Sequence, residues 1–453
     1  MSKESLNTTE HVRELLEPER PAAALEKQLD KLDFSDLLHA VFQLSHDEQR
    51  KLLSSVSPEW AAELVEELPD THAADLIEEM AARDAAPILE EMASDDRVDI
   101  LSEMEVADSE AILEYLEEDD VREFRELSSY LPNVAGGLMM TEFATYPMNA
   151  LVRDVVEDLT GREGDYEFLT VHYVYVVVRN HLLVGVVRLR DLVFADPDAR
   201  IGTVATKAKT VPPTASLQEL EEFFIDYDIA AVPVVDDQNH LLGIVRRRAV
   251  LEALAEKAES DNLKAAGIVG GDELRSMPVL LRSRRRLSWL SINIVLNIIA
   301  ASVIALYEDT LSAVIALAVF LPIVSDMSGC SGNQAVAVSM RELTLGAADP
   351  RDVMRVWGKE LSVGLINGLT LGILLACAAW AWKGNPVLGL VVGFALALNT
   401  VLAVSIGGTV PLVLKKMKID PAVASGPLLT TITDMCGFFL VLSLASLVLP
   451  RLT

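Results

Sequence analysis

The sequence predicts a multidomain protein with an α-helical solenoid, an α+β pair of repeats, a long connecting helix and an all-α membrane domain of five helices. Its charge is divided, because residues 1–281 hold 59 acidic and 25 basic residues, a net charge of -34, whereas residues 282–453 carry +4. Short repeats fill the acidic part, and long apolar stretches fill the remainder. Such a chain has to occupy two physical environments.

Residues 1–130 contain a 12-residue repeat in which small or apolar pairs are followed by leucine, isoleucine and acids. The repeated pairs are Ala61-Ala62, Ala73-Ala74, Ala85-Ala86 and Arg97-Val98. This pattern predicts a compact stack of short helices. The acidic outer face is either simply solvated or a surface for cations or docking. The negative charge argues against nucleic acid as a partner, because nucleic acid requires a basic surface.

Residues 131–258 contain a longer repeat, in which two glycine-centred segments lie 58 residues apart. These segments are Leu183–Val187 and Leu241–Val245. The β-branched segments Val174–Val178 and Ala231–Val235 precede them and predict strands, and a helix pattern follows each unit. The spacing resembles a tandem pair of CBS domains.

CBS domains often bind adenine nucleotides such as ATP, usually through a serine or threonine and an aspartate three residues later. The first repeat has Arg188 at the hydroxyl position and keeps Asp191, whereas the second has Arg246 and Ala249. The resemblance therefore confines a nucleotide site to the first repeat, at Asp191.

Residues 247–281 are predicted to connect the soluble and membrane parts. Residues 247–270 have the pattern of a long helix that carries the acids Glu252, Glu256, Glu259 and Asp261. Glycines then lead to a cluster of arginines at residues 282–286. A helix at this place can transmit the position of the soluble part to the membrane part.

Residues 282–453 contain five apolar stretches of the roughly 20 residues that a membrane span requires. They are Leu287–Tyr307, Leu311–Met340, Leu361–Trp382, Val387–Leu414 and Gly426–Leu449. Basic residues concentrate before the first stretch, between the second and third, and between the fourth and fifth. Positive charge marks the cytoplasmic side, so we expect the N-terminus inside and the C-terminus outside.

Asp434 lies within the fifth apolar stretch, in the run Pro427-Leu-Leu-Thr-Thr-Ile-Thr-Asp-Met-Cys-Gly437. A carboxylate at the centre of a membrane costs about 2.5–3.5 kcal/mol on insertion scales. No lysine or arginine within the apolar stretches is available as a partner, which favours a cation that binds transiently. The alternative is that Asp434 caps a helix or bonds locally to Thr430 and Thr433.

Polar residues also interrupt the second stretch, where Asp326 and Asn333 are candidates for facing an ion path. Polar residues at this depth are tolerated where they line a cavity or face another helix.

In the third stretch, Gly364, Gly368 and Gly372 recur every four residues and predict close helix packing.

The sequence argues against several other classes of protein. The three cysteines and seven histidines form no disulfide framework and no zinc spacing, and no catalytic constellation indicates an enzyme. The first residues, MSKESLNTTEHVRELLEPER, lack the apolar core of a signal peptide, so the acidic part is predicted to stay in the cytoplasm.

The order of these parts resembles the MgtE family of magnesium channels over nearly the whole chain. The most specific segments are Leu321–Val324 with Gly329–Ala335, and Asp420-Pro-Ala with Thr430–Asp434. The resemblance implies a homodimer in the bacterial inner membrane, with the second and fifth spans of both subunits lining one pore. It also implies that Asp434 selects the ion, which the carboxylates hold through its water shell.

Cytosolic magnesium closes the pore in this family by binding among the acidic soluble domains. The resemblance implies regulatory cation sites at Asp228, Asp261 and Asp420, and Glu259 is a further acid on the connecting helix. Arg248-Ala249 and Lys257 depart from a more acidic family pattern. We therefore hypothesise that Arg246, Arg247 and Arg248 replace a bridging cation with direct salt bridges to the solenoid.

Two alternatives to a magnesium channel remain at this point. One is a transporter for another divalent cation such as manganese or cobalt, and Cys330 and Asp326 leave this choice open. The other is a membrane sensor that conducts nothing, although a sensor would not require Asp434 or the polar break in the second stretch.

Overall fold

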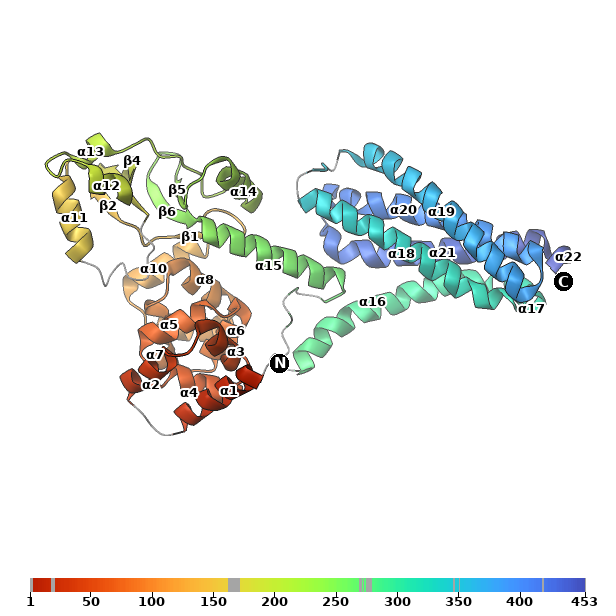
Figure 1. Cartoon of the computed structure of the whole chain (residues 1–453), viewed down its shortest axis with the longest axis horizontal. Coiled ribbons are helices and arrows are strands. Elements are labelled where there is room, and N and C mark those ends of the chain that lie inside the picture. The colour runs from red at the N-terminus through yellow and green to blue at the C-terminus, as the bar shows by residue number, and fades with distance from the viewer. Residues whose placement is uncertain are drawn as a thin grey trace. The chain divides into compact units, whose positions relative to one another are not determined.

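A computed structural model describes residues 3–17, 21–161, 172–268, 271, 273, 279–344, 347–349, 351–417 and 419–452 (Figure 1). The chain divides into two compact units, Met1–Glu256 and Lys257–Thr453. The first unit contains the solenoid and the repeat pair, and the second contains the membrane-type helices. Each unit is described by itself.

The predicted solenoid is confirmed as a stack of short helices. Helices α5 to α10 begin at residues 58, 70, 82, 94, 106 and 118, so the 12-residue step of the sequence is the step of the helices. The helices are α1 (Lys3–Leu16), α2 (Ala22–Leu29), α3 (Phe34–Val41), α4 (His46–Leu53), α5 (Pro58–Glu66), α6 (Asp70–Glu78), α7 (Ala82–Glu90), α8 (Ser94–Glu103), α9 (Val106–Leu113) and α10 (Glu118–Leu127).

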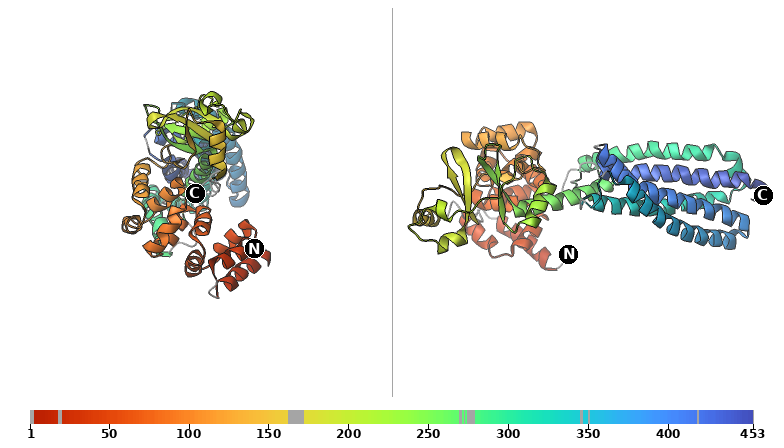
Figure 2. Two further views of the ribbon diagram at one scale, coloured as in Figure 1. Left: turned by 90° about the vertical axis from the view of Figure 1, so that its left-hand side faces the viewer. Right: turned by 90° about the horizontal axis from the view of Figure 1, so that it is seen from above.

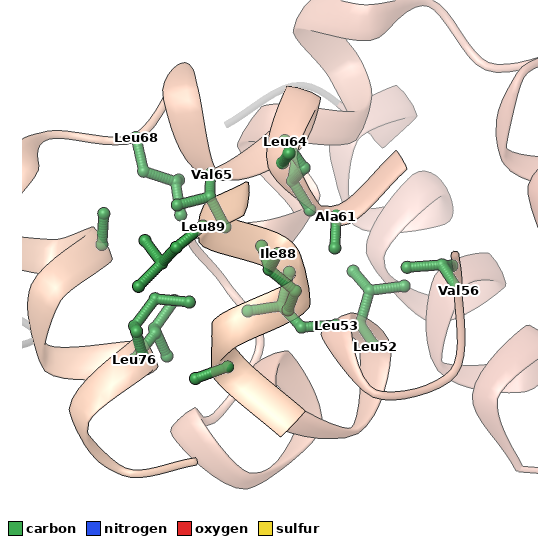
Figure 3. Packing of buried hydrophobic residues seen from close by; sticks show 14 of the residues in the cluster. Leu52, Leu53, Val56, Ala61, Leu64, Val65, Leu68, Leu76, Ile88 and Leu89 are labelled. Carbon is green, nitrogen blue, oxygen red and sulfur yellow. The ribbon is translucent and has the colours of Figure 1, made fainter. Parts of the chain in front are cut away.

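The repeat forms because each helix start and each small pair has a structural role. Ser45 and Ser57 cap α4 and α5 by accepting hydrogen bonds from backbone N–H groups of the first turn. The alanines of the three repeated pairs are at most 3% exposed and let neighbouring helices approach. Leucine, isoleucine and valine side chains fill the space between them (Figure 3).

The two α+β repeats each form a three-stranded sheet. In the first sheet, β2 (Thr145–Pro147) pairs in parallel with β3 (Tyr173–Val178), which pairs antiparallel with β4 (Leu182–Arg188). In the second, β6 (Leu241–Arg246) lies between β1 (Met139–Met140) and β5 (Ala231–Val235). The register shifts between Val176 and Val177 and again between Val234 and Val235, so even this irregularity repeats after 58 residues.

Helices cover these sheets. They are α11 (Val152–Gly161), α12 (Leu189–Phe194), α13 (Ile201–Val204) and α14 (Leu217–Asp226). The second sheet shares its apolar core with the end of the solenoid, because Val98 of α8 and Leu127 of α10 pack with Leu220 and Val245. The solenoid and the second repeat are therefore joined by buried apolar surface as well as by charge.

The connecting helix α15 (Arg247–Ala265) is shorter than the predicted helix over residues 247–270. Gly267 has a φ of +87°, and its N–H donates to the carbonyl of Lys264 while the N–H of Ile268 donates to that of Leu263. This is a glycine-terminated Schellman motif, which ends a helix because only glycine adopts the left-handed conformation without strain. The rest of the predicted connection lies partly outside the described residues.

The second unit is a bundle of long helices that run along a common direction (Figure 2). They are α16 (Val279–Ala305), α18 (Leu317–Thr344), α19 (Val353–Lys383), α20 (Pro386–Lys416) and α21 (Pro421–Leu447), with the short helices α17 (Glu308–Ala313) and α22 (Leu449–Leu452). Among the described residues, α16, α19, α20 and the part of α21 from Leu428 are long and apolar enough to cross a membrane.

The predicted all-α domain with five long helices is confirmed, but the predicted second stretch does not form one continuous helix. The stretch Leu311–Met340 begins in α17 and continues in α18 after a break at Val314. Helix α18 has 28 residues, a sufficient length, but its serines, Asp326 and Asn333 reduce its apolar character. Much of α18 is enclosed by protein, because it packs against both α20 and α21.

The predicted glycine face of the third stretch is confirmed as a packing surface. Gly364, Gly368 and Gly372 of α19 are buried, and a Cβ atom at each would lie within 3.2 Å of an α20 backbone atom. A similar close approach joins α18 and α20, since a Cβ on Gly407 would lie 2.2 Å from the carbonyl oxygen of Gly332. These glycines bring α20 close to two neighbours.

Candidate ion-binding sites

Asp434 lies inside α21 and faces α18. Its carboxylate is half-buried and accepts a hydrogen bond from the hydroxyl of Ser325. It is not a helix cap, because α21 begins 13 residues earlier with Asp420 as its cap. The hydroxyls of Thr430 and Thr433 donate to the carbonyls of Gly426 and Thr430 instead. The alternative of a local cap or threonine partner is thus wrong.

Asp326 directly follows Ser325, which binds this carboxylate, and Asn333 lies on the same helix, α18. Both are exposed in a single chain, and they are seven residues apart on α18, so they share one face about 10 Å apart along the helix. The charge of Asp326 interacts with that of Asp434. The structure therefore brings Asp326 close enough to Asp434 for their charges to interact, and Asn333 lies about two turns further along α18.

A second group of acids lies in the soluble unit, and the sequence reasoning missed it. Asp70 of α6, Asp99 of α8 and Glu256 of α15 lie close enough for the charge of Glu256 to act on both aspartates. Burial, followed by the charges of Glu256 and Glu103, raises the pKa of Asp70 to about 6. Burial, followed by Asp70 and Asp95, raises the pKa of Asp99 to about 8. The raised pKa values of Asp70 and Asp99 indicate that too little positive charge surrounds these carboxylates to stabilise their ionised forms.

The cluster continues along α8 to Asp95 and Asp96. Burial, followed by Asp95 and Glu66, raises the pKa of Asp96 to about 8, although Arg246 opposes the shift. The side chain of Asp95 is 7% exposed, and its Oδ1 atom has no hydrogen-bond partner in the described part of the chain. We call Glu66, Asp70, Asp95, Asp96, Asp99, Glu103 and Glu256 the acid cluster. The spacing of acids at 95, 96, 99 and 103 on one helix was the available sequence signal.

Two of the three consecutive arginines contact the solenoid, as hypothesised. The Nη2 atom of Arg246 lies 2.9 Å from Asp95 and 3.6 Å from Asp96, and Arg248 lies 3.0 Å from Glu67. Arg247 does not follow the hypothesis. It pairs instead with Asp228 at 3.2 Å and donates to backbone carbonyls within the second repeat, because the helix turns its side chain towards α14.

The predicted regulatory residues fall into different surroundings. Asp228 is already paired with Arg247, and Glu259 is exposed on α15. Asp261 and Asp420 are brought together, since burial and then the charge of Asp420 raise the pKa of Asp261. Asp420 also caps α21 and lies 3.8 Å from Lys264.

The predicted nucleotide residue, Asp191, is half-buried in the first turn of α12. The equivalent turn of the second repeat has Ala249 in place of the aspartate, and Arg246, which corresponds to Arg188, is engaged with Asp95. The two repeats therefore differ at this place in structure as they do in sequence.

Three parts of the chain match models of known families. Residues 32–133 match the MgtE intracellular N domain, residues 201–256 match the CBS domain, and residues 321–444 match the MgtE divalent cation transporter domain. The CBS match covers the second repeat, and the third match includes most of α18, all of α19 and α20, and most of α21.

Curated relatives match over most of their length. The magnesium transporter MgtE of Thermus thermophilus is 36% identical over 330 residues, which cover 72% of each chain. The magnesium transporter MgtE of Bacillus subtilis is 30% identical over 332 residues, which cover 73% of each. The crystal structure of the soluble part of a magnesium transporter has 27% identity and a TM-score of 0.51, covering 56% of this chain and 99% of that one. The chain therefore belongs to the MgtE family of divalent cation transporters.

Proposed function

We propose that this protein conducts magnesium across the membrane along a path that contains Asp434. The observation that carries the proposal is a carboxylate inside the helix bundle whose partner is a neutral serine, Ser325. In the described residues, no lysine or arginine pairs with Asp434. Magnesium prefers oxygen ligands and keeps several of its waters, so a carboxylate that binds the hydrated ion suits it. The two relatives described above are magnesium transporters.

The path is proposed to lie between two copies of the chain. Asp326 and Asn333 are exposed on α18, within a helix bundle of membrane-span length. Exposed polar side chains at membrane depth require water or a protein partner. A two-fold dimer supplies both, because it places α18 and α21 of each subunit around one axis and presents each acid twice. Two Asp434 carboxylates then face one divalent ion.

The proposed orientation places the soluble unit in the cytoplasm and the C-terminus outside, in a bacterial inner membrane. Arginines begin α16, and lysines end α20, whereas the opposite helix ends carry few basic residues. Positively charged ends are retained on the cytoplasmic side.

The acid cluster is proposed as the place where cytosolic divalent cations regulate the path. Asp70, Asp96 and Asp99 have pKa values raised by burial and by each other's charge. A divalent cation would relieve this repulsion and stabilise the contact of α6 and α8 with Glu256 on the connecting helix. Asp261 and Asp420 form a second, smaller pair of acids for the same purpose. Asp228 is less suited, because Arg247 already occupies it.

The arginines are proposed to take over part of this role. Arg246 and Arg248 neutralise solenoid acids that would otherwise need a cation. The salt bridges of these arginines already stabilise the contact between the solenoid and the second repeat before any cation binds. Magnesium therefore regulates this contact less strongly than it would if acids alone lined it. An adenine nucleotide such as ATP is proposed to bind in the first repeat, which keeps Asp191, because the second repeat has Ala249 at that position.

The test is magnesium uptake into cells that lack their own magnesium transporters. The parent chain should restore growth and uptake, and Asp434→Asn, which keeps the size but removes the charge, should not. Asp309→Asn, which removes an exposed carboxylate of α17 outside the proposed path, serves as the matched control and should retain most uptake. Restoration by both variants would move the selective site away from Asp434.

The same assay separates the alternatives. Competition by manganese and cobalt reports ion preference, because a transporter for another divalent cation would take these up in preference to magnesium. Good membrane expression of the parent without uptake of any divalent ion would favour a non-conducting sensor.

A further inference from the structure

One buried amide joins the three helices that surround Asp434. Asn399 of α20 is 0% exposed. Its Nδ2 atom donates to the hydroxyl of Ser328 on α18 at 2.5 Å and to the carbonyl of Thr433 on α21 at 3.0 Å. Both amide hydrogens are therefore used, one on each of the helices that carry the candidate ion site.

These contacts flank the bond between Ser325 and Asp434. Thr433 directly precedes Asp434, and Ser328 lies one helical turn after Ser325. The hydroxyl of Ser328 donates to the carbonyls of Val324 and Ser325, so it is free to accept from Asn399. The amide thus fixes the two helices relative to each other within one turn of the carboxylate.

The neighbouring sequence leaves room for this amide. A Cβ atom on Gly437 would lie 2.8 Å from the Nδ2 atom of Asn399. Two turns along α20, Gly407 lies against the backbone of Gly332 on α18. Small residues therefore let α20 approach both partners closely enough for a short side chain to reach them.

We propose that Asn399 is a positioning residue that sets the separation of Ser325 and Asp434, and through it the preference for magnesium. The inference rests on the proposed function, because it concerns the geometry of the same ion path. Asn399 itself is buried away from solvent, so it acts through Ser328 and Thr433. Partners that orient a metal-binding group change its ion affinity when they are removed, even though they do not touch the ion.

The chain offers a matched control in the next residue. Thr400 is also 0% exposed on α20, but its hydroxyl has no hydrogen-bond partner in the described part of the chain. Thr400→Val keeps the shape and removes a hydroxyl that holds nothing. Asn399→Leu keeps a similar volume and removes both bonds, and Ser328→Ala removes one acceptor.

The experiment uses the full chain reconstituted in liposomes with a dye that reports internal magnesium. Uptake is measured alone and in competition with manganese and with calcium, and rates are normalised to the amount of inserted protein. Asn399→Leu should change the ratio of magnesium to manganese uptake by about tenfold, the size that outer partners of metal ligands show. Ser328→Ala should shift the ratio in the same direction, and the double variant should add little. Thr400→Val should match the parent.

A purely structural role would lower the amount of inserted protein and leave this ratio unchanged. Unchanged ratios in Asn399→Leu and Ser328→Ala, with uptake by the parent and none by Asp434→Asn, would overturn this inference alone. If Asn399→Leu does not insert, Ser328→Ala decides by itself. Absence of magnesium uptake by the parent would overturn the proposed function and this inference with it.

Discussion

Replacement of Arg246 by alanine tests whether arginine has taken over the role of a cation at the acid cluster. The guanidinium lies 2.9 Å from Asp95, whose side chain is 7% exposed, and 3.6 Å from Asp96. Removing it leaves a buried carboxylate next to Asp96 without its cationic partner. The local contact between α8 and the second repeat should weaken, because the acids then repel one another.

The size of the effect follows from the bond that is lost. A hydrogen bond to a charged partner contributes about 1.5–3 kcal/mol. Arg246 is 33% exposed, so water offsets part of the loss. We therefore expect Arg246→Ala to destabilise the contact between α8 and the second repeat by about 1.5 kcal/mol. The population of molecules in which this contact is open should then be roughly tenfold larger. Magnesium at 100 times its dissociation constant would supply about 2.7 kcal/mol and should restore the contact.

Limited proteolysis of the full chain across a magnesium titration measures this population. Arg246→Ala should be cleaved about tenfold faster than the parent without magnesium and be protected as well as the parent at saturation. Arg153→Ala is the control, because Arg153 pairs with Asp198 on the surface, where both side chains are more than half exposed. Equal cleavage of parent and Arg246→Ala without magnesium, with equal midpoints, would refute the reasoning.

Two further outcomes follow from the same structure. Gly407→Ala should lower the free energy of unfolding by about 1–3 kcal/mol, because the added methyl group overpacks against Gly332, and it should lower the fraction that stays folded in detergent. Gly358→Ala is the control, because a Cβ atom there meets nothing within 4 Å. Equal yields of the two variants in size-exclusion chromatography would contradict this prediction. Without divalent cations, the thermal midpoint of the soluble unit within the full chain should fall as pH rises from about 4 to 8. The pKa values of Asp96 and Asp99 are raised to about 8, so the folded state holds more protons than the unfolded state in this window and loses stability as they leave. Magnesium should offset the fall near pH 8, and a midpoint that rises over this range would exclude the raised pKa values as its cause.

Local patterns were enough to predict most elements of the fold. The 12-residue step set the starts of α5 to α10, and the 58-residue offset located the paired strands. Both patterns are periodic in the chain itself, so they do not depend on distant contacts. The membrane boundaries were less accurate. Hydropathy does not record the break at Val314 or the cap at Asp420, which are decided by backbone conformation.

By itself, the sequence determined the order of domains, the family and the identity of Asp434 as the carboxylate that needs explanation, because each of these depends on composition and spacing along the chain. Only the tertiary structure decided which side chains meet. It placed Ser325 and Asn399 around Asp434, and it brought Arg246 to Asp95 across 151 residues. Contacts between distant segments follow from packing and desolvation, which no local pattern contains.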